Sequence, residues 1–139
     1  MNDGFTLIDS LTIPSTLTNI SKVEMFIDKV CSPFSHDEDI YGNVLIAVTE
    51  AVNNSIIHGN KQNASTFVEI DFFKTHESIS FSVRDSGSGF DHGNLPDPTA
   101  PENINNESGR GVFLMRNLAD EVVYNDKGNE VTLIFIIHG

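Results

Sequence analysis

The sequence predicts an α+β fold, a two-layer sandwich with helices on one face of a mixed, mostly antiparallel sheet. Two observations lead to this prediction. Apolar residues recur at helical spacing in two segments of the first half, and strand-like alternation occurs near the N-terminus and again in the second half. The chain has 139 residues, enough to bury one core, so we expect residues 1–139 to form a single domain.

A strand and a helix are predicted at the N-terminal end. Residues 5–13 alternate loosely between apolar and polar side chains and stop before Pro14, which suits a first strand. Apolar side chains then recur three and four positions apart: Val23, Phe26, Ile27 and Val30. Residues 16–31 are therefore expected to form an amphipathic helix, with Ser15 as its N-cap and Pro33 as its stop.

A second helix is predicted for residues 36–58. Acidic residues at its beginning favour a helix N-terminus, and Gly59 supplies the C-cap. Its apolar stripe is again spaced three and four positions apart: Ile40, Val44, Val48, Ala51, Val52 and Ser55. Glu50 and Asn54 fall on a neighbouring stripe, so a carboxylate and an amide project together one helical turn apart.

The middle of the chain predicts a hairpin and a long loop. Residues 66–74 and 77–85 alternate with period two, and Thr75-His76 forms the turn between them. Residues 91–108 hold three prolines and four asparagines but few apolar side chains, which indicates a loop. A loop of that length in so small a domain is usually functional.

A short helix and two closing strands are predicted for the C-terminal part. Apolar residues from Val112 to Ala119 have helical spacing, and Asp120 lies near the end of this helix. Residues 122–124 and 131–137 then read as strands on either side of a turn.

The chain is strongly acidic. Its net charge is −12, from 20 acidic and 8 basic residues, which argues against nucleic-acid binding because phosphate contacts require clustered Lys and Arg. A basic protein partner and simple solubility are both compatible with this charge. The single cysteine, Cys31, excludes an internal disulfide and is expected to be a small buried residue.

No membrane attachment is expected. The N-terminal residues lack the basic region and apolar run of a secretory signal. No stretch reaches the roughly 18 apolar residues that are needed to span a bilayer. We therefore expect a cytoplasmic protein.

Three short segments carry the candidate chemistry: Glu50-Ala-Val-Asn-Asn-Ser-Ile-Ile-His-Gly-Asn60, Asp85-Ser-Gly-Ser-Gly-Phe90 and Ser108-Gly-Arg-Gly-Val112. The chain has no Walker-A pattern and no signature of eukaryotic-type kinases, so any nucleotide site is of another kind. Gly87 and Gly89 permit a close backbone approach. Gly109 and Gly111 stand at the start of a predicted helix, where free N–H groups favour an anion.

In this order and with these gaps, the three segments resemble the N, G1 and G2 boxes of the serine kinases that act as anti-sigma factors. These kinases belong to the GHKL superfamily of gyrase, heat-shock chaperone, histidine kinase and MutL. The resemblance runs from about residue 10 to residue 137 and is most specific at 48–59. It implies the GHKL (Bergerat) ATPase fold, which agrees with the sandwich above, and an ATP-dependent protein serine/threonine kinase that uses Mg²⁺.

The resemblance also implies roles for residues of the first two boxes. Glu50 matches the general base that activates the attacking hydroxyl. Asn54 matches the residue that coordinates Mg²⁺ through its side-chain oxygen. Asp85 matches the aspartate that accepts a hydrogen bond from the adenine amino group, with Gly87 and Gly89 leaving room for the nucleotide.

Further implied roles fall on the third box and the last strand. Gly109 and Gly111 match phosphate-side residues, and Arg110 between them is a candidate contact to the γ-phosphate. Thr132 matches a threonine that lies near the adenine in the family. Residues 91–108 correspond to the ATP lid, which here contains no lysine or arginine.

The resemblance implies partners as well. The substrate would be an anti-sigma factor antagonist, a small STAS-type protein, and further partners would be a sigma factor and a second copy of the chain. Three alternatives stay open: an ATP-binding signalling module that switches a non-sigma partner, a histidine-kinase-type catalytic domain, and a non-catalytic binding protein. The lack of an upstream helical segment with a phosphoacceptor histidine argues against the histidine-kinase domain.

Overall fold

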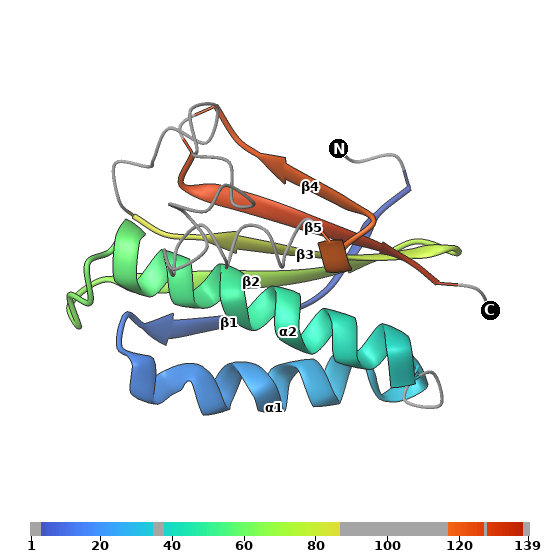
Figure 1. Cartoon of the computed structure of the whole chain (residues 1–139), viewed down its shortest axis with the longest axis horizontal. Helices are drawn as coiled ribbons and strands as arrows, with labels where there is room; N and C mark the ends of the chain where they lie inside the picture. The colour runs from blue at the N-terminus through green and yellow to red at the C-terminus, as the bar shows by residue number, and fades with distance from the viewer. Residues whose placement is uncertain (1–3, 35–37, 87–116, 127, 138–139) are drawn as a thin grey trace, which may run out of the picture.

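The computed structural model describes residues 4–34, 38–86, 117–126 and 128–137. They form two layers, a five-stranded sheet of order β1-β2-β3-β5-β4 and two helices on one face of it (Figure 1). The strands are β1 Thr6–Pro14, β2 Phe67–Lys74, β3 Ser78–Arg84, β4 Glu121–Tyr124 and β5 Glu130–Ile136. The helices are α1 Ile20–Val30 and α2 Glu38–Asn54, with short helical turns at Leu17–Asn19, Ser32–Phe34 and Ser55–Gly59. The predicted α+β sandwich is confirmed.

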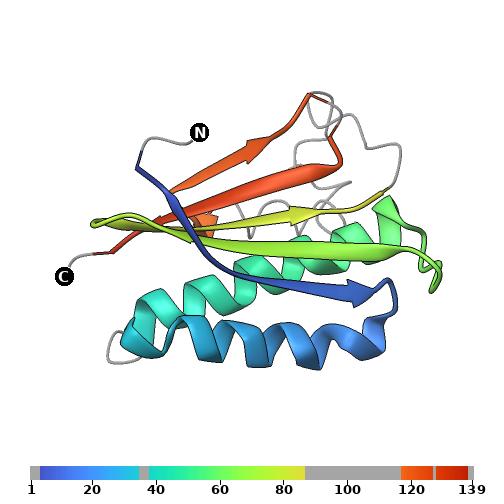
Figure 2. The same cartoon turned by 180° about the vertical axis from the view of Figure 1, so that it is seen from behind.

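The sheet is antiparallel throughout its described part. All four strand pairings, β1 with β2, β2 with β3, β3 with β5 and β4 with β5, run in opposite directions. A mixed sheet was expected, but the described strands include no parallel pair. Helix α2 packs on β3 and β5, and α1 packs on β1 and on α2. Both described helices lie on the same face of the sheet (Figure 2).

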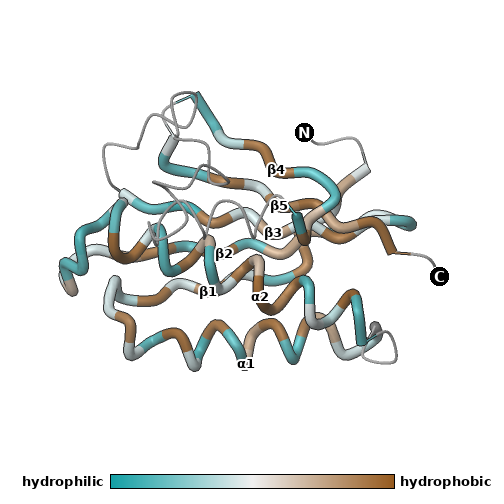
Figure 3. Tube along the Cα trace, in the orientation of Figure 1, coloured by the Kyte–Doolittle hydropathy of each residue, from teal (hydrophilic) through white to brown (hydrophobic). Residues whose placement is uncertain are grey.

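The hydrophobic core lies between the two layers. Alternate residues of the strands point toward the helices, and hydrophobic and polar residues alternate along both layers (Figure 3). The rings of Phe72 and Phe81, which face each other across β2 and β3, have centroids 5.0 Å apart. Each fully buried side chain of this size stabilises the fold by about 1.5 to 3 kcal/mol. Cys31 is buried beside this core, as expected.

The first helix begins later than the sequence indicates. Residues Leu17–Asn19 form a 3₁₀ turn, and the α-helix starts only at Ile20. Ser15 is therefore not the N-cap. It is fully buried, and its backbone N–H donates to the Thr66 carbonyl oxygen at 3.0 Å, which ties the end of β1 to the start of β2.

The second helix changes its winding before it ends. Its α-helical part stops at Asn54, and Ser55–Gly59 form a π turn instead of the α-helix predicted to residue 58. The Asn60 N–H donates to the carbonyl oxygen of Ser55 at 2.8 Å, five residues back, as a π turn requires. Such turns occur often at functional sites. Here the π turn carries Gly59 to the end of β3.

Several predictions fall on residues outside the described ranges. They are the loop at 91–108, most of the helix from Val112 to Asp120, and the two glycines in each of the second and third segments. Among the described residues, no helix is long and apolar enough to cross a membrane.

Candidate functional site

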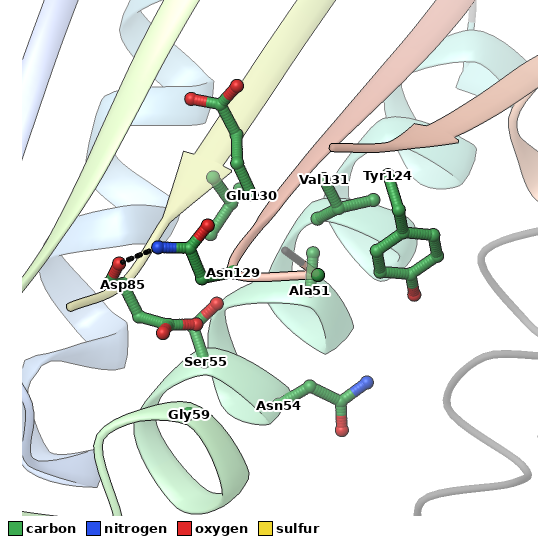
Figure 4. A pocket seen from close by; sticks show the side chains of 11 residues that line it. Ala51, Asn54, Ser55, Gly59, Asp85, Tyr124, Asn129, Glu130 and Val131 are labelled. Atoms are coloured by element: carbon green, nitrogen blue, oxygen red, sulfur yellow. Dashed lines mark hydrogen bonds between the residues drawn. The ribbon is translucent and has the colours of Figure 1, made fainter. Parts of the chain in front are cut away.

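A recess opens where α2 ends against β3, β5 and the turn between β4 and β5 (Figure 4). It measures about 300 Å³ when its open mouth is included. The residues that line it are Ala51, Asn54, Ser55, Gly59, Val83, Asp85, Tyr124, Gly128, Asn129, Glu130 and Val131. Apolar side chains of the core form one wall, and amide and carboxylate groups form the other. We call this feature the recess.

The carboxylate of Asp85 lies against the backbone of Gly59. Asp85 is only 8% exposed, and a Cβ placed on Gly59 would stand 2.2 Å from its Oδ2 and 2.4 Å from its Cγ. No side chain fits at such a separation. Gly59 has no left-handed torsion, so glycine is required here for close approach and not for backbone conformation.

Asn129 holds the backbone of Asp85 from the side of β5. The Asp85 N–H donates to the Asn129 carbonyl oxygen at 2.9 Å, and the Asn129 side-chain amide donates to the Asp85 carbonyl oxygen at 3.3 Å (Figure 4). This pairing continues the β3–β5 ladder by one residue. The exit of β3 is therefore fixed in the recess.

The turn that carries Asn129 is organised by Asn125. The side-chain oxygen of Asn125 accepts the N–H groups of Gly128 at 2.8 Å, Asn129 at 3.0 Å and Glu130 at 3.2 Å. Its amide nitrogen donates to the side-chain oxygen of Asn129 at 2.7 Å. Gly128 has φ +79°, a left-handed conformation that favours glycine. One side chain thus shapes the whole turn.

A buried carboxamide, Asn60, holds the segment on the other side of Asp85. Its side-chain oxygen accepts the N–H of Ser86 at 3.0 Å and the Ser86 hydroxyl at 3.2 Å. Its amide nitrogen donates to the Ser15 hydroxyl oxygen at 2.7 Å and to the Phe67 carbonyl oxygen at 3.0 Å. The end of the π turn is thereby joined to three strands.

Glu50 and Asn54 lie on α2, one turn apart, and both are partly buried. Asn54 lines the recess, whereas Glu50 lies beyond its lining, one turn toward the helix N-terminus. Among the described residues, no cluster of three or more His, Cys, Asp or Glu side chains could hold a metal ion unaided.

Comparison with known proteins decides the family. The family model of the histidine kinase-like ATPase domain matches residues 13–135. The chain belongs to this family. The GHKL-type fold that the sequence predicts is thereby confirmed.

Relatives of this ATPase domain include named kinases. RsbW serine-protein kinases from Staphylococcus aureus strains JH9, Newman and JH1 are each 29% identical over 131 residues, which cover 88% of this chain and 82% of theirs. A crystal structure of the RsbU and RsbW domains of a Mycobacterium tuberculosis protein has a TM-score of 0.62 over 94% of this chain, at 13% identity. This chain spans 32% of that longer one, and the likeness concerns the fold alone.

The ATPase domain brings together some of the predicted site residues. Asn54 and Asp85 both line the recess, with Glu50 one helical turn from Asn54. Five other predicted residues lie outside the described ranges: Gly87, Gly89, Gly109, Arg110 and Gly111. Their roles stay predictions.

Thr132 does not lie in the recess. Its hydroxyl lies 3.0 Å from that of Ser82, its cross-strand neighbour, and both are buried. Successive strand residues point to opposite faces, and Val131 is the one that faces α2 and the recess. Thr132 is thus not among the residues that line the recess, and its role near the nucleotide stays a prediction.

Sequence reasoning missed four residues that build the recess: Gly59, Asn60, Asn125 and Asn129. Gly59 and Asn60 belong to the first of the three segments, where the sequence indicates only a C-cap for Gly59 and no role for Asn60. Asn125 and Asn129 occur in a polar segment that is typical of a turn. For Asn125 a signal was available, because an asparagine three residues before a glycine often organises a turn. The contact of Gly59 with Asp85 and the burial of Asn60 are tertiary features without a local pattern.

Proposed function

We propose that the recess binds the adenine of ATP and that the chain is a protein serine/threonine kinase of a partner-switching system. The observation that carries the proposal is the buried carboxylate of Asp85, fixed by the Gly59 contact and by Asn129. An ionised carboxylate only accepts hydrogen bonds, so it selects the 6-amino group of adenine over the 6-carbonyl of guanine. Losing this pairing costs about 1.5 to 3 kcal/mol, which is roughly ten- to a hundredfold in affinity.

The rest of the recess suits a flat, largely apolar base. Ala51, Val83 and Val131 are buried and present hydrocarbon, and Tyr124 adds an aromatic ring beside them. Binding sites for small molecules commonly combine such walls with a few fixed polar groups. A base that enters here would meet Val131 and Asn129.

Mg²⁺ fits the donors that α2 offers. This ion prefers oxygen ligands and is commonly held by one or two protein groups together with substrate phosphates. Asn54 supplies one such oxygen through its carboxamide. When bound, Mg²⁺ supplies positive charge that neutralises the phosphates.

Glu50 is the proposed general base. Its carboxylate would accept the proton of the attacking hydroxyl, so that the proton rests on a glutamate oxygen while the oxygen of the hydroxyl bonds to the γ-phosphorus and the ADP oxygen leaves. Gly109, Arg110 and Gly111 are proposed to lie at the phosphates, with Gly87 and Gly89 leaving room for the nucleotide. These five assignments rest on the family resemblance.

The proposed substrate is a serine or threonine of an anti-sigma factor antagonist, a small STAS-type protein. A sigma factor and a second copy of the chain are proposed as further partners. Support comes from the serine-protein kinase relatives and from the net charge of −12, which suits a basic docking surface on a partner.

A ligand-binding experiment tests the adenine site. Thermal unfolding is followed with and without Mg²⁺-ATP and Mg²⁺-GTP. At 100 times the dissociation constant, ATP should stabilise the chain by about 2.7 kcal/mol. GTP at the same concentration should stabilise it less, and Asp85→Ala should remove the difference. An equal response of the unaltered chain to both nucleotides would refute the adenine site.

A transfer experiment tests the kinase activity. The chain is mixed with labelled ATP and the proteins that copurify with it, and the label is traced to Ser, Thr or His. Label on a partner's serine or threonine, lost in Glu50→Gln but with ATP binding retained, supports the proposal. Label on histidine would instead support a histidine-kinase-type domain, and nucleotide binding without transfer would support a binding module.

A further inference from the structure

We propose that Asn60 is a positioning residue for nucleotide selectivity, acting on Asp85 through Ser86. This inference rests on the proposed function of the recess. Asn60 follows the π turn directly, is 6% exposed, and hydrogen-bonds to Ser86, the residue that follows Asp85. Its role is separate from that of Asp85, which would contact the base.

The carboxamide of Asn60 uses all of its hydrogen-bonding capacity. Its nitrogen donates two hydrogen bonds, to Ser15 and Phe67, and its oxygen accepts two from Ser86. The orientation of the amide is fixed by chemistry, because the Phe67 carbonyl can only accept and the Ser86 N–H can only donate. A side chain held by four hydrogen bonds to three residues cannot rotate without breaking several of them.

Asp85 is consequently held from three directions. Asn129 bonds both its N–H and its carbonyl oxygen, and Asn60 bonds the N–H of the next residue, Ser86. Gly59 lies against its carboxylate. Because Gly59 and Asn60 are neighbours in the chain, one short segment both supports the carboxylate and fixes the backbone that carries it. Pre-organisation of this kind raises affinity by removing ordering costs from the binding step.

The amide nitrogen of Asn60 is held by residues of the sheet. Ser15 and Phe67 lie at the paired ends of β1 and β2, which belong to the rigid sheet. Ser15 also accepts a hydrogen bond from the Thr66 hydroxyl at 3.1 Å. Asn60 therefore links the sheet edge formed by β1 and β2 to the exit of β3, where the recess begins.

A purely structural role predicts a different behaviour from a positioning role. Loss of the Asn60 carboxamide in a structural role would lower stability and weaken all nucleotides by the same factor. Loss of positioning would weaken ATP more than an analogue that lacks the 6-amino group, since only ATP uses the carboxylate of Asp85. The ratio of the two dissociation constants is therefore the informative quantity.

The test measures dissociation constants for Mg²⁺-ATP and for Mg²⁺-purine riboside triphosphate, which lacks the 6-amino group. The unaltered chain should prefer ATP, and Asp85→Ala should abolish the preference. Asn60→Ala should reduce that preference by about tenfold, the lower value expected for a hydrogen bond to a charged group. Asn60→Ser, which keeps a polar group in the same space, should reduce it in the same direction if Asn60→Ala does not fold.

Ser15→Ala is the matched comparison. It removes one of the two partners of the Asn60 amide nitrogen and leaves the Phe67 and Ser86 contacts in place, so the preference for ATP should fall less than in Asn60→Ala. An unaltered preference in a folded Asn60 variant would overturn the inference. If the unaltered chain shows no preference, or Asp85→Ala keeps it, the proposed function fails and not the role of Asn60 alone.

Discussion

The Cα of Gly59 lies directly against the carboxylate of Asp85, so close that a Cβ would stand 2.7 Å or less from all three atoms of the carboxyl group. Gly59 ends the π turn that follows α2, and Asp85 follows β3. The contact therefore joins the first and second of the three sequence segments into one wall of the recess. The position of the Asp85 carboxylate therefore depends on the absence of a side chain at Gly59.

Replacement of Gly59 by alanine should impair the recess. The added methyl group meets the carboxylate, which then moves or displaces the π turn, at a cost of about 1 to 3 kcal/mol for overpacking. The gain of up to about 1 kcal/mol from alanine's higher helix propensity does not offset this. We expect lower stability in urea unfolding and a loss of affinity for Mg²⁺-ATP comparable to that of Asp85→Ala.

Gly42→Ala is the control for this substitution. Gly42 lies in α2, the helix that the π turn follows, and a Cβ added there meets no heavy atom within 4 Å. The change should therefore stabilise the chain by roughly 0.4 to 1 kcal/mol and leave nucleotide binding unaltered. If the two alanine variants behave alike, the contact between Gly59 and Asp85 does not constrain the site.

Thr132→Val tests the side of the sheet on which this residue acts. The substitution leaves the Ser82 hydroxyl buried without its partner, which should lower stability by about 1 to 3 kcal/mol. The double variant, Ser82→Ala combined with Thr132→Val, removes both hydroxyls and should by comparison leave stability nearly unchanged. Affinity for Mg²⁺-ATP should stay the same in both variants. A loss of affinity without a loss of stability would instead place Thr132 at the nucleotide.

The orientation of Thr132 shows a physical limit of sequence reasoning on strands. Val131, Thr132 and Leu133 are all buried, so the strand has no exposed face whose polarity marks its orientation. A shift of one residue in a strand moves every side chain to the opposite face. Only the pairing of Thr132 with Ser82, across β3 and β5, identifies its side of the sheet.

Other features of the site were predictable to different degrees. Glu50 and Asn54 lie on one helix, so their spacing alone predicts that their side chains project together. In the structure they lie one turn apart on α2. The π turn was not predictable, because its residues also fit an α-helix, and its winding coincides with long-range contacts of Gly59 and Asn60. Local pattern determines the first kind of feature, and tertiary packing determines the second.

Asn125→Ala tests the turn between β4 and β5. The substitution removes the acceptor of three backbone N–H groups, so we expect a loss of about 1 to 3 kcal/mol in the free energy of unfolding. Because Asn129 in this turn holds Asp85, affinity for Mg²⁺-ATP should fall as well. Asn125→Asp keeps an acceptor oxygen and should lose less stability than the alanine variant. Equal losses would show that the three backbone contacts contribute little.

The buried thiol of Cys31 should make the chain less stable at alkaline pH. Burial, and to a lesser extent the negative charge of Asp28, raises the pKa of Cys31 from 9.0 to about 12. The unfolded chain therefore releases this proton first as the pH rises, so its contribution to stability is complete below pH 9 and is lost progressively up to pH 12. One such group changes the free energy of unfolding by at most about 1.4 kcal/mol per pH unit. Urea unfolding should show a shallower pH dependence above 9 for Cys31→Ala, whereas identical slopes in the two proteins would contradict this assignment.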